Sequence, residues 1–300
     1  MKDIIFLFGA GASYGCGGVI PEQPPLGSCL YPALKENYPA SWGSLSPHIV
    51  KKISSDFEQG MKIIYDELGS AIPGLMRELA VYLIQFRSYN KSTLYNLLIA
   101  DLNEAGILHK TLFSTLNYDC ILEFCLAEMG HNISYFDDDH IDSVPVWKLH
   151  GSSNMFSHGV QAGQGVSYGT GVTFEGGVEA FLDSDRVIQK CLVETGLAPV
   201  MCLYMEGKIL NVSPSIIKSL QDSWAERVLS ASSVFCIGVR PMLGDSHIWD
   251  PISQTDASVY FVGNQSEIGE WIENNRVGTS TYLGNRFNTA YSSIRERINL

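Results

Sequence analysis

Short apolar runs, each followed by a polar or glycine-bearing turn, constrain the fold of this chain more than any other feature of its sequence. These runs lie at residues 4–8, 111–116, 144–149, 232–238 and 258–263. Runs of this length are typical of buried strands, and most of these are followed by a segment with helical spacing. Strands that alternate with helices predict a mostly parallel sheet covered on both faces. We therefore expect an α/β, doubly wound, Rossmann-like fold.

One long segment departs from this alternation. Residues 28–105 are mostly helical in pattern, with apolar residues every three or four positions in 49–68, 74–86 and 93–106. We expect them to form a helical insert within a single domain spanning residues 1–300. The glycine-rich residues 158–177 fit neither the helical nor the strand period, and we expect a loop or a small β-excursion there.

The first apolar run ends in a glycine-rich loop, "GAGASYG", that begins at Gly9. Glycine lets main-chain N–H groups approach a ligand closely, commonly a phosphate at the start of a helix. We expect the four residues of the loop that could hold phosphates to be Gly9, Ala10, Gly11 and Ser13. A tight strand-to-helix turn is the simpler alternative. Tyr14 stands where the strict dinucleotide fingerprint needs glycine, and the ribose-binding acid is missing, which disfavours an ordinary dehydrogenase.

Polar residues follow the other predicted strands. Asn117 and Asp119 follow 111–116, and His150 follows 144–149. Gly238 ends the later run at 232–238, and Asp245 and His247 follow it. Ligands of open parallel sheets bind beyond the carboxyl ends of the strands, so these residues should meet the glycine loop in one crevice. Singly, Asn117, Asp119 and Asp245 could be helix caps and His150 a turn histidine.

Composition excludes several classes of protein. A net charge of −12 and a pI near 5.0 argue against direct binding of nucleic acid. The seven cysteines include no CxxC pair and predict buried thiols in a reducing cytoplasm. No apolar run approaches the roughly 18 residues of a membrane helix, so we expect a cytoplasmic protein with no membrane association.

Four motifs, taken in chain order, carry a family resemblance: "FGAGAS", "STLNYD", "KLHGS" and "IGVRPMLGDSHI". Together they resemble the motifs of sirtuin-like domains. The "NYD" form is similar to the bacterial NAD-consuming branch found in antiphage defence systems such as Thoeris. The chain lacks the four-cysteine zinc ribbon of sirtuins proper and the aspartate-phenylalanine-arginine that follows the proline in deacylases. These departures weigh against protein deacylation.

The resemblance implies an NAD glycohydrolase with NAD as its substrate and no metal. It implies that Asn117 hydrogen-bonds the ribose and the attacking water and that His150 is the general base. Asp119 would hold the nicotinamide amide, and Asn211 the adenosine ribose. It also implies a role in antiphage defence, triggered by homo-oligomer formation or by a partner such as an ATPase or an Argonaute-type protein.

Three alternatives to NAD hydrolysis remain open. The first is a sirtuin-type deacylase or ADP-ribosyltransferase, which would use the same NAD pocket. The second is a metal phosphoesterase, suggested by "GDSH" at 244–247 and "DDDH" at 137–140. The third is a non-catalytic sensor that binds NAD or a derivative. Incubation with NAD alone discriminates among them.

Overall fold

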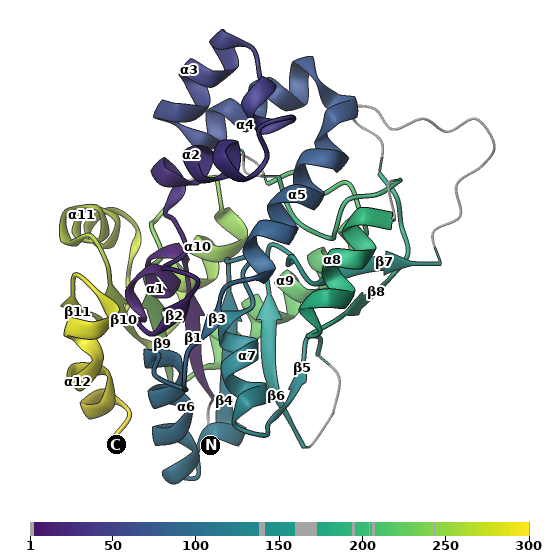
Figure 1. The fold of residues 1–300 in the computed structure, drawn as a ribbon. Helices are drawn as coiled ribbons and strands as arrows, with labels where there is room; N and C mark the ends of the chain where they lie inside the picture. Colours follow the sequence, from purple (N-terminus) through teal and green to yellow (C-terminus); the bar gives the residue numbers. More distant parts are fainter. Residues whose placement is uncertain are drawn as a thin grey trace.

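A computed structural model describes residues 3–137, 142–159, 173–193, 196–203, 205, 208–242 and 244–299. Its centre is a seven-stranded sheet of order β11-β10-β9-β1-β4-β6-β5, in which every pair of neighbours is parallel (Figure 1). The strands are β1 Ile4–Phe8, β4 Thr111–Thr115, β5 Asn132–Ser134, β6 Ser143–Lys148, β9 Ser233–Ile237, β10 Ser258–Val262 and β11 Ser280–Gly284. The predicted α/β, doubly wound fold class is confirmed.

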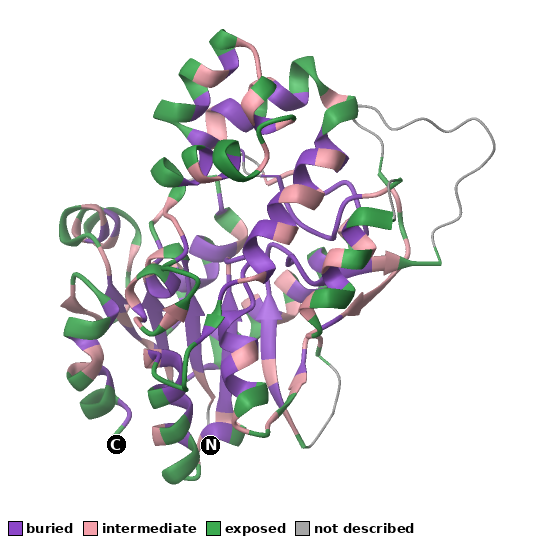
Figure 2. Ribbon diagram, viewed as in Figure 1, coloured by how far each residue is buried: buried purple, intermediate pink, exposed green. Residues whose placement is uncertain are grey.

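Helices cover both faces of this sheet because its strands are apolar on both sides. On one face, Phe6 and Phe8 of β1 pack with α6 Leu94–Glu104, α7 Ile121–Glu128 and α12 Phe287–Arg297. On the other face, Ile5 and Leu7 pack with helices α9 Pro214–Ser230, α10 Ser246–Gln254 and α11 Gln265–Asn275. Figure 2 shows the buried strands between helices whose outer sides are exposed. Alternate residues of one strand thus supply two separate cores.

The predicted helical segment begins with four helices that lie together above the sheet in Figure 1. They are α2 Gly27–Asn37, α3 Pro47–Ser55, α4 Phe57–Glu67 and α5 Ile72–Ile84. The pattern at 49–68 is two helices because the Asp56 carboxylate accepts the Gln59 N–H at 3.1 Å and begins α4. Helix α6, by contrast, packs against α7 in the layer that covers the sheet. The insert boundaries at 28–105 stay a prediction.

The remaining elements are short. They are α1 Ala10–Gly15, α8 Ser184–Val193, the 3-10 turns Trp42–Ser44, Gly69–Ala71 and Leu108–Lys110, and the paired strands β2 Val19–Ile20 with β3 Arg87–Ser88 and β7 Met155–His158 with β8 Gly177–Ala180. The pairing of β7 with β8 brackets the glycine-rich residues, of which 160–172 lie outside the described residues. Residues 138–140 of the "DDDH" motif lie outside them too.

Two further predictions concern the thiols and the membrane. All seven cysteines are free thiols, and six are buried as predicted, but Cys29 is exposed because it lies on the outer side of α2. Over the described ranges, no helix combines the length and the apolar character needed to cross a membrane.

Candidate active site

The glycine loop after β1 packs directly against the turn after β9. Gly9 N–H donates to the Ile237 carbonyl at 3.0 Å, and Gly11 N–H donates to the Gly238 carbonyl at 3.1 Å. A Cβ at Gly9 would lie 2.4 Å from the Gly238 oxygen, and one at Gly238, which has φ of +65°, would lie 2.1 Å from Ala12 N. Glycine is therefore required because two backbone segments touch here.

This packing bears on the predicted phosphate contacts. The N–H groups of Gly9 and Gly11 point at β9 and its turn, so the conformation described does not offer them to a ligand. Ala10 is the exposed first residue of α1, and its N–H has no acceptor within the helix. The predicted role of the loop in phosphate binding stays a prediction, with Ala10 as its best-placed donor.

Asn117 is held by the same loop. Its side-chain Nδ2 donates to the Gly9 carbonyl at 2.9 Å and to the Ser13 hydroxyl at 3.0 Å. Because a carbonyl can only accept, the contact with Gly9 fixes which end of the amide is Nδ2. Both amide hydrogens are thereby used, and Oδ1 is left as the group that can accept a hydrogen bond from a ligand.

Asp119 lies beside the Asn117 and Ser13 pair. It is 8% exposed, and its Oδ1 accepts the Ile121 N–H at 3.2 Å at the start of α7. The helix-cap alternative is thus part of what this side chain does. Burial raises the pKa of Asp119, whereas the Lys148 charge and hydrogen bonds from Ile121 and Ser13 lower it. Ser13 therefore contacts both predicted polar residues of the turn after β4.

His150 is placed by the strand that precedes it. Leu149 N–H donates to the Thr115 carbonyl at 3.1 Å, and the His150 carbonyl accepts the Cys202 N–H at 2.9 Å. Gly151 follows with φ of +74°, and its close approach to the Val200 carbonyl leaves no room for a Cβ. The backbone on both sides of His150 is therefore fixed, and the imidazole is 3% exposed.

The sheet register brings Asn117 and His150 to the same level. Thr115 of β4 is paired with Lys148 of β6. Asn117 comes two positions after Thr115, and His150 comes two positions after Lys148. Adjacent strands lie about 4.8 Å apart. Asn117 and His150 are accordingly neighbours at the carboxyl edge of the sheet, as the sequence predicts.

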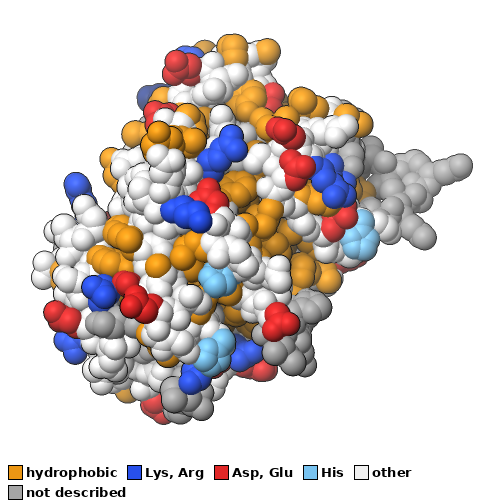
Figure 3. Space-filling model, turned by 60° about the horizontal axis from the view of Figure 1, so that its bottom comes forward, with side chains coloured by type: hydrophobic (Ala, Val, Ile, Leu, Met, Phe, Trp, Pro, Cys, Tyr) orange, Lys and Arg blue, Asp and Glu red, His pale blue; other side chains and the backbone are white. Residues whose placement is uncertain are grey.

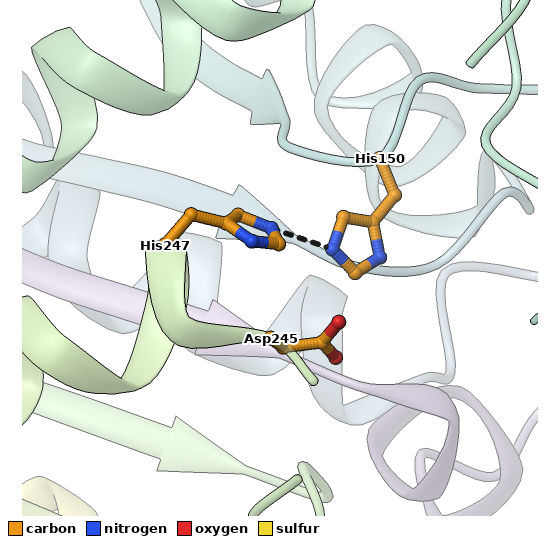
Figure 4. A group of neighbouring side chains, drawn as sticks. All are labelled: His150, Asp245 and His247. Atoms are coloured by element: carbon orange, nitrogen blue, oxygen red, sulfur yellow. Dashed lines mark hydrogen bonds between the residues drawn. The ribbon is translucent and has the colours of Figure 1, made fainter. Parts of the chain in front are cut away.

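Two residues from the start of α10 complete a cluster around His150, shown in Figure 4. His150 Nε2 lies 3.0 Å from His247 Nε2. The Asp245 carboxylate lies toward both rings, and the ligand atoms of the three residues all lie within 4.8 Å of one another. Asp245 occupies the N-cap position of α10 without a side-chain capping hydrogen bond, so its predicted alternative role as a cap is not what this structure shows.

Both imidazoles of the cluster favour their uncharged form. Burial lowers the pKa of His150 well below its usual value, helped by His247 and Lys208, and burial lowers the pKa of His247 to about 4. At 3.0 Å a single hydrogen lies between the two Nε2 atoms, because two N–H groups cannot donate to each other. The pair is thus neutral near pH 7.

Asn211 lies on a different segment, just before α9. It is buried, and its carbonyl accepts the Phe174 N–H at 2.8 Å. Its predicted role toward an adenosine ribose stays a prediction.

The structure places His247, which the sequence predicts in the same crevice as Asp245, beside His150. Two other residues near the cluster, Glu58 and Lys208, were not predicted. Lys208 lies 2.6 Å from Glu58 of α4, and its charge lowers the pKa of both histidines. Sequence patterns give no signal for this ion pair, since the partners are 150 positions apart.

Large cavities lie elsewhere on the molecule. One of about 610 Å³ is lined by residues 130–136 together with Ala127, Ala180 and Leu182, at the β5 edge of the sheet. The predicted site residues are not part of this lining, and Asn117, Asp119, His150 and Asp245 are nearly closed to solvent. On the face shown in Figure 3, acidic and basic side chains are scattered among one another rather than gathered into one basic patch.

No protein-family model matches the chain, and no curated protein matches it. Solved structures of Sir2 and sirtuin proteins do match over nearly its whole length. One, from work on the structural basis of sirtuin substrate affinity, is 15% identical and covers 98% of this chain and 94% of its own, with a TM-score of 0.46. Another, a Sir2 homologue variant in complex with ADP-ribose, is 14% identical over 99% of this chain and 93% of its own, with a TM-score of 0.48.

Proposed function

We propose that this protein hydrolyses NAD to nicotinamide and ADP-ribose. The observation that supports the proposal most is the meeting of Asn117, Asp119 and His150 at one edge of the sheet. All three are polar, at most 8% exposed and fixed by backbone contacts. Buried polar groups are costly, so a site that gathers several of them favours a binding or catalytic role over a purely structural one.

The fixed amide of Asn117 suits a substrate that carries hydroxyl groups. With both Nδ2 hydrogens used by Gly9 and Ser13, Oδ1 can accept from a ribose hydroxyl or from the attacking water. Asp119, on the same turn, would hold the carboxamide of nicotinamide. These two residues would set the orientation of the bond that breaks.

The reaction needs little acid catalysis because the nicotinamide ring of NAD is cationic. It leaves with the electron pair of the ribose bond and becomes neutral, while water adds to the ribose carbon. The water proton would pass to His150 at Nδ1, the ring nitrogen that does not contact His247. General-base catalysis of this kind is typically worth about 10²- to 10⁴-fold in rate.

Access to the site requires movement. The carboxyl-edge residues named here are nearly closed to solvent, so NAD has to part the segments that cover them. This is the behaviour expected of an enzyme that is inactive until a trigger acts. We propose that homo-oligomer formation or a partner protein, such as an ATPase or an Argonaute-type protein, opens the site in the cytoplasm of a bacterium, where NAD depletion would serve antiphage defence. The motif resemblance supports this role.

The test is NAD turnover followed by chromatography, on the protein alone and on its assembled or partner-bound state. Asn117→Ala and His150→Ala should each lower nicotinamide release by about 10²-fold or more. His109→Ala, at an exposed position before β4, is the matched control and should keep the parent rate.

Each alternative has its own outcome in this experiment. Undiminished nicotinamide release from either variant would remove that residue from the mechanism. Deacetylated peptide formed in proportion to NAD consumed would indicate a deacylase. Binding of NAD without turnover in every assembly state would indicate a sensor.

A further inference from the structure

We propose that His150, Asp245 and His247 bind one divalent transition-metal ion, and that this ion inhibits the enzyme. The binding part of the proposal stands on the geometry of the cluster alone. The inhibitory part rests on the proposed function, because it requires His150 to act as the base.

The spacing of the cluster is close to that of a metal site. The two Nε2 atoms lie 3.0 Å apart, and the three ligand atoms lie within 4.8 Å of one another. In a tetrahedral zinc site with metal–nitrogen distances near 2.05 Å, two ligating nitrogens are about 3.3 Å apart. To admit an ion, the imidazoles need to separate by a few tenths of an ångström and to turn by about 35°, so that both Nε2 lone pairs point at the metal rather than at each other.

Asp245 is an independent indication of a cation. The residue is 4% exposed. It occupies the N-cap position of α10, but its side chain makes no capping hydrogen bond. The carboxylate is instead turned toward the two histidine rings (Figure 4). A buried carboxylate is costly unless it is paired or coordinates a metal. The Lys208 charge already favours the Asp245 carboxylate, and an ion between the rings would add a second favourable charge.

The contact between the two histidines suits a metal. Metals bind the neutral imidazole, and at 3.0 Å at least one of the two Nε2 atoms carries a lone pair rather than a hydrogen. The ion would replace the hydrogen shared by the two Nε2 atoms. That hydrogen moves to Nδ1 of the ring that carried it, so binding to the neutral pair releases no proton.

The surrounding charges leave the cluster slightly negative. Lys208 and Lys218 act on His247 as positive charges and Asp250 as a negative one, while Lys208 and Glu58 act on Asp245 with opposite signs. Together with Asp245 these groups sum to one net negative charge. Lys208 is moreover paired with Glu58 at 2.6 Å, which reduces its repulsion of an incoming cation.

The donor set selects the class of ion. Two imidazoles and one carboxylate, with an open fourth position, form the ligand set of many zinc sites. Magnesium and calcium prefer oxygen ligands alone. Zinc and its spectroscopic substitute cobalt are therefore the ions to test.

Inhibition follows from the tautomer. A His150 ring bound to metal through Nε2 carries its hydrogen on Nδ1 and has no lone pair left for a water proton. The same ring cannot hold the ion and act as the base. The metal-free protein would accordingly be the active form.

Binding is tested by titrating Co²⁺ into chelator-stripped protein and following visible absorption, with Zn²⁺ calorimetry beside it. We expect one ion per chain and the intense bands of tetrahedral cobalt. His247→Asn and Asp245→Asn should each weaken binding at least about 10-fold, with circular dichroism checking the fold. His109→Asn is the control. Unchanged binding in both site variants, or no saturable binding by the parent, would overturn the proposal.

Inhibition is tested separately on the parent protein. Zn²⁺ should lower NAD hydrolysis in proportion to occupancy, and excess EDTA should restore it. Full activity of the zinc-loaded protein would overturn the inhibitory role. Absence of NAD hydrolysis with and without the ion would contradict the proposed function and the inhibitory role together, and would leave the measured metal site standing.

Discussion

The Lys148 ammonium lies 2.9 Å from the Glu123 carboxylate, and both side chains are closed to solvent. Lys148 also donates to the Asp119 carbonyl at 2.6 Å. One buried cation therefore ties the strand that precedes His150 to the turn that carries Asp119 and to helix α7. The relative position of the two halves of the candidate site depends on it.

Lys148→Met should destabilise the protein by about 3 to 5 kcal/mol, because it leaves the Glu123 carboxylate buried without its partner. Chemical denaturation with the parent as reference measures this loss. The double variant Lys148→Met with Glu123→Leu removes both charges and should recover much of the stability. A double variant as unstable as the single one would show that the ion pair is not the cause.

Gly238→Ala tests the contact between the two loops. The new Cβ would lie 2.1 Å from Ala12 N, at a residue with φ of +65°, so we expect a loss of more than about 2 kcal/mol and of NAD hydrolysis. Gly106→Ala is the matched control, with φ of +67° and nothing within 4 Å of the new Cβ. The loss of stability in Gly106→Ala measures the cost of placing alanine at a positive φ, without any clash of its Cβ. Equal losses in the two variants would argue against the loop contact.

Ser13→Ala tests how the Asn117 amide is held. It removes the hydroxyl that accepts from Asn117 Nδ2 at 3.0 Å, and one hydrogen bond of this kind is worth about 1 kcal/mol. We expect NAD hydrolysis to fall by about fivefold. Tyr95→Phe removes a third partner of the Ser13 hydroxyl, 3.2 Å away, and leaves the contacts of Ser13 with Asn117 and Asp119 in place. Its rate should stay near that of the parent, and a larger loss in Tyr95→Phe would contradict this assignment.

The sequence predicts the central strands and the residues at their carboxyl ends, but it does not predict the two outermost strands. The central strands are read from apolar runs, and their turns place Asn117 and His150 together because parallel strands end at one edge. The edge strands β5 and β11 are not predicted, because β5 is short, β11 is half exposed, and both carry polar residues. A continuous apolar run identifies a strand that is buried on both faces, and the edge strands are not buried in this way.

Pairings between distant residues left no periodic signal. His247 lies 97 positions after His150, and the turn after 232–238 predicts it in the crevice but not its contact with His150. Lys148 looks like the polar end of a strand in "VPVWKL", although its side chain is fully buried. Its partner, Glu123, sits in a helix that otherwise reads as apolar. Such pairs are fixed by three-dimensional packing, which local propensity does not encode.

The pH dependence of NAD hydrolysis tests the state of His150. Burial, His247 and Lys208 lower the pKa of this imidazole well below its usual value of 6.5, so at pH 6.5, where a free imidazole is half protonated, the ring is uncharged and can accept a proton. For chelator-treated protein we expect no loss of rate near pH 6.5 and an acid limb at lower pH. Lys208→Met removes a positive charge that disfavours the protonated ring, so the pKa rises and the limb moves to higher pH. Glu58→Gln removes the negative partner of Lys208 and should move the limb the other way. The measurement is the rate of NAD hydrolysis from pH 4 to 8 for the parent protein, Lys208→Met and Glu58→Gln. An acid limb of the parent protein centred at pH 6.5 would rule out His150 as a base buried in this cluster.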